Sequence, residues 1–171
     1  MQKVFTVLFV LGLTGAGETP DSKISISEAG EPGTAMVVDV QVFGADGKTP
    51  AVGLSVQVFH TDNEGYYSPG GRNESKRRLK GFMTTDETGR FRFTSIRPMP
   101  YPMGGVPAHV HVILSPSGAS HQSLELHFSG DEALTANQLK RDGARGVFAH
   151  IQPLVADKHG VLHGSWKLKL N

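Results

Sequence analysis

The sequence reads Met36-Val37-Val38-Asp39-Val40-Gln41-Val42-Phe43 and continues with Gly44-Ala45-Asp46-Gly47. Successive side chains of a β-strand point to opposite faces, so Val38, Val40 and Val42 share one face of this run. The four residues that follow are types that form tight turns. This stretch therefore predicts a half-buried strand that ends in a turn.

The same period of two recurs along the chain. It predicts further strands at residues 54–59, 90–93, 108–114, 123–128 and 165–170. One helix is predicted over Asp131–Arg141, because Ser129 and Glu132 have the spacing of a capping box. Six or more short strands separated by turns predict an all-β fold, an immunoglobulin/transthyretin-like antiparallel β-sandwich with one short helix.

The composition limits the possible functions. A length of 171 residues fits one domain, and 17 Lys and Arg against 16 Asp and Glu give a net charge of +1. Without a basic block, the sequence gives no sign of a nucleic-acid partner. The absence of cysteine excludes a disulfide framework, a thiolate metal site and a cysteine nucleophile. A metal would have to bind to His, Tyr or carboxylate side chains.

The N-terminus has the pattern of a secretory signal peptide. Lys3 precedes an apolar run over residues 4–13, and small residues follow. We expect residues 1–17 to be a signal peptide cleaved near Ala16 or Gly17, and the protein to be exported to the periplasm or secreted. An apolar first strand is the alternative. The run is too short to span a bilayer, so no stable membrane anchor is expected. Residues 18–34 are expected to form a loose arm before a sandwich domain at 35–171.

Histidine and tyrosine are the side chains that suggest chemistry. His109 and His111 are two apart in a predicted strand, so both imidazoles lie on one face and form half of a metal site. A solvated or hydrogen-bonded pair is the alternative. Tyr101 lies in a proline-rich loop, and Tyr66 and Tyr67 end a turn. Tyrosine ligates strongly Lewis-acidic metals, with ferric iron the usual candidate, although packing is its more common role.

Four motifs in consistent order resemble the intradiol ring-cleavage dioxygenases. They are D-x-x-G-x-Y at residues 62–67, T-D-x-x-G-x-F-x-F at 85–93, R-P-x-x-Y-P at 97–102 and P-A-H-x-H at 107–111. The resemblance covers roughly residues 36 to 170. From its length, we expect the chain to lack the extra helical domain of the catechol 1,2-type members and to be more similar to a protocatechuate 3,4-dioxygenase-like core.

The resemblance implies a mononuclear non-haem Fe(III) centre with Tyr67, Tyr101, His109 and His111 as ligands. Tyr66 occupies the variable position of its motif. It also implies that a catechol displaces Tyr101, the catalytic tyrosine, and that the displaced phenolate takes up a substrate proton. O2 then opens the ring between the hydroxylated carbons to give a muconate-type diacid. The implied partners are a small aromatic diol and O2, with a homo-oligomer as a possible assembly.

Two positions depart from the family pattern. Val106 stands where the family carries Arg before P-A-H-x-H, and Glu125 and His127 stand where it carries Gln and Tyr. Arg72 and Arg97 are candidates to replace the missing cation. His60 lies near the site or packs in the core. A basic loop either is solvated or attracts a carboxylated or phenolic substrate. It contains Arg72, Lys76, Arg77, Arg78 and Lys80. The alternative function is a non-catalytic transthyretin-like or carbohydrate-binding β-sandwich that retains the family scaffold.

Overall fold

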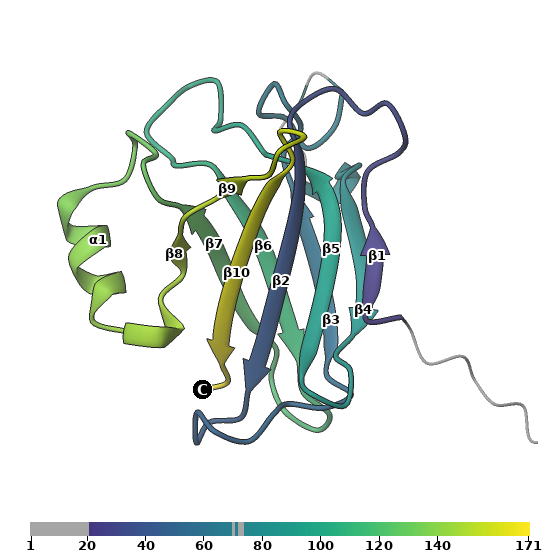
Figure 1. The fold of residues 1–171 in the computed structure, drawn as a ribbon, viewed down its shortest axis with the longest axis vertical. Helices are drawn as coiled ribbons and strands as arrows, with labels where there is room; N and C mark the ends of the chain where they lie inside the picture. The colour runs from purple at the N-terminus through teal and green to yellow at the C-terminus, as the bar shows by residue number, and fades with distance from the viewer. Residues whose placement is uncertain (1–20, 70, 72–73) are drawn as a thin grey trace, which may run out of the picture.

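The computed structural model describes residues 21–69, 71 and 74–171. Within these residues, two five-stranded sheets pack face to face (Figure 1). The first sheet has the order β1-β5-β2-β10-β9, with strands β1 (Lys23–Ser25), β5 (Arg90–Ile96), β2 (Ala35–Phe43), β10 (Leu162–Lys169) and β9 (Val155–Ala156). The second has the order β4-β3-β6-β7-β8, with β4 (Lys80–Thr84), β3 (Ser55–His60), β6 (His109–Ser115), β7 (Gln122–Phe128) and β8 (Ile151–Gln152). The prediction of an all-β sandwich is confirmed. The expected signal peptide at residues 1–17 lies outside the described residues.

The strand directions are mixed. Most neighbours are antiparallel, but β1 runs parallel to β5, β10 to β2, and β8 to β7. Side chains alternate with a period of two in either direction, so alternation cannot distinguish the two arrangements. The expected antiparallel sandwich is therefore corrected in these three pairings.

The core lies between the inner faces of the sheets. Val38, Val40 and Val42 of β2 are buried as the alternation predicts, and they share the core with the aromatic rings of both sheets. Trp166 of β10 is 1% exposed, and its indole nitrogen donates to the carbonyl of His150 at 2.8 Å. That hydrogen bond satisfies the one polar atom of the largest buried side chain.

Part of the expected arm belongs to the sandwich. β1 pairs with β5, and Ile24 and Ile26 pack across Gly81 of β4, where a Cβ atom would lie 2.2 Å from Cδ1 of Ile24. The expectation of a loose arm is therefore wrong for residues 23–26. A strand of three residues is too short to show a clear alternation, which explains the miss.

The helix begins later than the sequence predicts. α1 (Ala136–Gly143) is capped by Thr135 and Gln138, which form a reciprocal capping box. The carboxylate of Asp131 instead accepts from the backbone amides of Ala108 and Ala133, at 2.9 and 3.0 Å, and holds a turn against the start of β6. The helix lies beside β7 and β8 (Figure 1), and the short 3-10 helices are η1 (Glu74–Lys76) and η2 (Gly146–Phe148). Across the described ranges, no helix has the length and apolar character needed to cross a membrane.

Candidate metal centre

The outer face of β6 carries both histidines of the H-x-H motif. Val110 and Val112 fill the core, so His109 and His111 point away from the first sheet. In the register of the sheet, His111 lies between Phe59 of β3 and Glu125 of β7. His109 lies opposite His127 of β7.

Two loops bring the tyrosines over this face. The turn at residues 62–67 carries Tyr67, and the loop at 97–102 carries Tyr101. Met99 fastens them together: its carbonyl accepts from Thr61 Oγ1 at 2.7 Å, and its amide donates to the carbonyl of Asp62 at 3.1 Å. The close approach of the two loops requires glycine at position 65, where φ is +84° and a Cβ atom would lie 2.2 Å from the carbonyl oxygen of Pro100.

The four predicted ligands converge. Oη of Tyr67 lies 2.7 Å from Oη of Tyr101 and 2.7 Å from Nε2 of His111. Nε2 of His111 lies 3.0 Å from Nε2 of His109. The structure thus brings two phenol oxygens and two imidazole nitrogens to one point, and it places Tyr67 rather than its neighbour Tyr66 there. Metal binding by these residues stays a prediction.

The donor chemistry of the cluster fits a metal ion. Nδ1 of His109 donates to the carbonyl of Pro107 at 2.8 Å, which leaves a lone pair on Nε2. Burial, helped by the nearby His109, lowers the pKa of His111 to about 4, so this ring is neutral near pH 7. Its Nε2 has one lone pair or one N–H but contacts both Tyr67 and His109. A cation shared by all four groups would satisfy them together.

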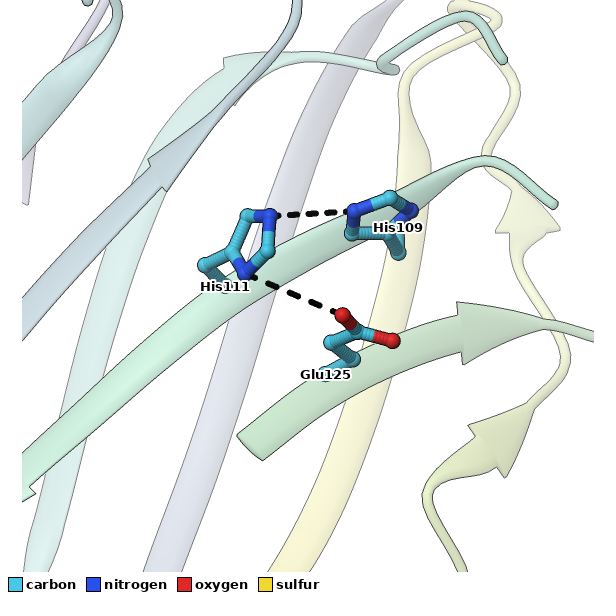
Figure 2. A group of neighbouring side chains, drawn as sticks. All are labelled: His109, His111 and Glu125. Atoms are coloured by element: carbon cyan, nitrogen blue, oxygen red, sulfur yellow. Dashed lines mark hydrogen bonds and ion pairs between the residues drawn. The ribbon is translucent and has the colours of Figure 1, made fainter. Parts of the chain in front are cut away.

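Glu125 approaches His111 from the other side of its ring. His109, His111 and Glu125 form a second possible metal-binding group (Figure 2), with Oε1 of Glu125 4.0 Å from Nδ1 of His111. Oε2 lies 3.3 Å from Nε2 of His127, and the hydrogen bond from His127 lowers the pKa of Glu125 to about 2. Because Glu125 faces Nδ1 and the tyrosine cluster faces Nε2, we assign Glu125 a place beside the four-residue set.

Arg77 is a cation close enough to act on His111. The ring of Phe59 stacks on His111 with centroids 4.4 Å apart, and the guanidinium of Arg77 lies 3.8 Å from the centre of the Phe59 ring. Arg97, one of the two expected replacements for the missing cation, lies over Phe128 instead, at 5.8 Å. Arg72, the other, lies outside the described residues. Sequence reasoning named Arg77 only as part of the basic loop and missed Phe59, although pairing the two strands in register would have placed Phe59 beside His111.

His60 is a buried structural group. Its Nδ1 donates to the carbonyl of Thr61 at 2.6 Å, and its Nε2 accepts from the hydroxyl of Ser95 at 2.8 Å. Burial lowers the pKa of His60 to about 4. Of the two expectations for this residue, the packing role is the one that its contacts support.

A cavity of about 450 Å³ lies between β7 and the helical segment. Glu125 and His127 form part of its wall, and α1 and the loop after it contribute Arg141 and Arg145. Its volume is in the range of small-molecule sites. Through Glu125, this cavity shares a wall residue with the surroundings of His111.

Comparisons with known proteins point to one family. A family model described as dioxygenase matches residues 13–170. The chain is 30% identical over 158 residues to catechol 1,2-dioxygenase 1 of Acinetobacter lwoffii, which covers 81% of this chain and 48% of that protein. It is 28% identical over 163 residues to the intradiol ring-cleavage dioxygenase hqdA of Aspergillus niger, covering 84% of this chain and 48% of the relative. The chain thus spans about half the length of these curated relatives.

Solved structures show the same fold. Catechol 1,2-dioxygenase from Pseudomonas arvilla C-1 superposes with a TM-score of 0.65 at 27% identity, covering 91% of this chain and 58% of that one. The dioxygenase domain of a dioxygenase carbohydrate-binding protein fusion from Streptomyces sp. SirexAA-E has a TM-score of 0.66 at 23% identity. It covers 93% of this chain and 95% of its own, so the sandwich described above corresponds to that whole domain in fold.

Proposed function

Because the chain belongs to the intradiol ring-cleavage dioxygenase family, we propose that it is an Fe(III)-dependent oxidoreductase that opens a catechol ring with O2 between the two hydroxylated carbons. The observation that carries the proposal is the convergence of Tyr67, Tyr101, His109 and His111, which are linked in series by contacts of 2.7, 2.7 and 3.0 Å. Phenolate and imidazole together suit a hard, strongly Lewis-acidic ion such as ferric iron.

The four side chains would hold one mononuclear non-haem iron. When bound, ferric iron supplies a Lewis acid that favours the deprotonated form of a chelating diol. Tyr67 is 2% exposed and packs against Phe59, whereas Tyr101 lies partly exposed on the proline-rich loop. Tyr101 is therefore the phenol with room to move aside, and its Oη is the base that takes up a proton from the diol.

The surrounding charges favour an uncharged catechol. Glu125 is an anion beside His111, Val106 adds apolar surface before β6, and Phe59 separates Arg77 from the cluster. A carboxylate on the ring would meet the anionic Glu125, and Val106 supplies no positive charge to balance the two anions. We therefore propose that catechol or a catechol with a bulky neutral substituent is used better than protocatechuate.

Reconstitution with ferric iron tests this function. The iron-loaded protein should absorb in the visible range through tyrosinate-to-iron charge transfer, and catechol should move that band to longer wavelength while phenol should not. With O2 present, oxygen uptake and a ring-opened diacid should follow. Tyr101→Phe should retain iron but lose most turnover. A protein that binds ferric iron without responding to any catechol would favour the non-catalytic sandwich.

We also propose that the protein is exported, on the pattern of Lys3 and the apolar run at 4–13. Intact-mass measurement on protein from its native host tests this. A mature N-terminus just after Ala16 or Gly17 is expected, and a cytoplasmic protein that retains Met1 would contradict it.

A further inference from the structure

We propose that Glu125 is a positioning residue of the metal centre, acting through the Nδ1–H of His111. This role rests on the metal-binding part of the proposed function. The carboxylate holds the proton on Nδ1, which fixes the ring so that Nε2 faces His109 and Tyr67. Histidine ligands in metal sites commonly have such a hydrogen-bonding partner, and the partner fixes both the tautomer and the ring orientation.

The sheet register creates this arrangement. Glu125 lies directly opposite His111 in the antiparallel pairing of β7 with β6, so both side chains leave the same face of the sheet. Figure 2 shows the carboxylate of Glu125 pointing toward Nδ1 of His111, while Nε2 of His111 points toward His109. Oε1 of Glu125 lies 4.0 Å from Nδ1 of His111, and Nε2 of His109 lies 3.0 Å from Nε2 of His111. The two nitrogens of the ring therefore have separate tasks. The separation of 4.0 Å is longer than a hydrogen bond, and a side-chain rotation or one bridging water would complete the contact.

His127 anchors the second carboxylate oxygen. Its Nε2 lies 3.3 Å from Oε2 of Glu125, while its Nδ1 is buried and has no hydrogen-bond partner among the described residues. A buried Nδ1 without an acceptor favours the tautomer in which the proton is on Nε2, and that N–H donates to Glu125. His111, Glu125 and His127 thus form a chain of three side chains across β6 and β7.

The negative charge has a consequence for the metal. A carboxylate beside the Nδ1–H makes the imidazole a stronger donor at Nε2, which stabilises Fe(III) more than Fe(II). A neutral amide in the same position can accept the same hydrogen bond but adds no charge. Glu125→Gln therefore separates the effect of the charge from the effect of the contact.

The experiment compares metal binding by the wild type, Glu125→Gln and Glu125→Ala, with Glu132→Gln as the matched control at an exposed carboxylate. Affinities for Fe(III) and Fe(II) are measured by chelator competition, together with the reduction potential and the charge-transfer band. We expect ferric affinity to fall about 10-fold in Glu125→Gln and up to about 100-fold in Glu125→Ala, with a smaller loss for Fe(II). A 10-fold change in the ratio of the two affinities raises the reduction potential by about 59 mV.

Each alternative outcome has a distinct meaning. Wild-type ferric affinity and potential in both Glu125 variants would overturn the role of Glu125 and leave the metal centre intact. Equal losses for both oxidation states, at an unchanged potential, would also overturn it and indicate a general packing effect. A wild-type protein that binds no ferric iron would overturn the metal centre itself. His127→Gln gives a second test, because it should cause a smaller shift in the same direction.

Discussion

The outer faces of the two sheets share one sequence pattern but differ in chemistry. On the first sheet, Asp39 of β2 and Arg92 of β5 form an ion pair with N–O distances of 2.7 and 2.9 Å, and their side chains stay 38% and 48% exposed. On the second, His109 and His111 occupy equivalent alternating positions but lie beneath the tyrosine-bearing loops. Alternation determines which side chains share a face of the sheet, and the loops that cover a face determine whether those side chains form a site.

Removing a side chain from the covered face should have the largest effect. His111→Ala should reduce ferric affinity by well over 100-fold, because even the loss of a ligand's hydrogen-bonding partner typically costs about 10- to 100-fold. Asp39→Ala, on the exposed face, should leave ferric affinity unchanged. Chelator competition measures both. Equal affinities for His111→Ala and the wild type would show that the covered face is not the metal site.

Disturbing the loops should have the next largest effect. Gly65→Ala introduces a Cβ atom 2.2 Å from the carbonyl oxygen of Pro100 at a positive φ, so we expect a loss of about 3 to 4 kcal/mol in the free energy of unfolding. Gly53 has a φ of +66° with open space around it, so Gly53→Ala should cost only about 1 kcal/mol. Urea denaturation measures both. Similar losses in the two variants would contradict the close contact between the loops.

The buried His60 should make stability depend on pH. Its pKa is about 4 in the folded state and near 6.5 when unfolded, so between these values the unfolded chain binds more protons. The contribution is fully present above pH 6.5, and about 2 to 3 kcal/mol is lost as pH falls to 4. Urea denaturation of the metal-free protein across this range, compared with His60→Gln, measures the difference. His111 adds a change in the same direction, so the variant should retain part of the slope.

The smallest effect should come from the exposed ion pair. A double-mutant cycle with Asp39→Ala and Arg92→Ala should give a coupling of about 0.5 to 1 kcal/mol in unfolding free energy, decreasing with added salt. The geometry is bidentate, but water competes for both groups. A coupling of several kcal/mol would show that this face is less solvated than its exposure indicates.

The sequence alone determined the sandwich, because the alternation along β2, β3, β5, β6, β7 and β10 reflects burial of one strand face. It also indicated all four predicted ligands. The same period of two pairs His109 with His111, and the resemblance to the family identified Tyr67 and Tyr101. The sequence did not predict β1 or the start of α1, because a few residues give too little periodicity. It did not predict the direction of β10, because side chains alternate in the same way in parallel and antiparallel pairs.

Tertiary contacts determine which groups surround the cluster of Tyr67, Tyr101, His109 and His111. The register of β6 with β3 and β7 places Phe59 and Glu125 on opposite sides of His111, although these residues are distant in sequence. The same is true of Arg77, which reaches Phe59 from a loop. Charge and burial at the site depend on these pairings, and a local pattern does not determine them, because strand register and loop packing depend on contacts across the whole sandwich.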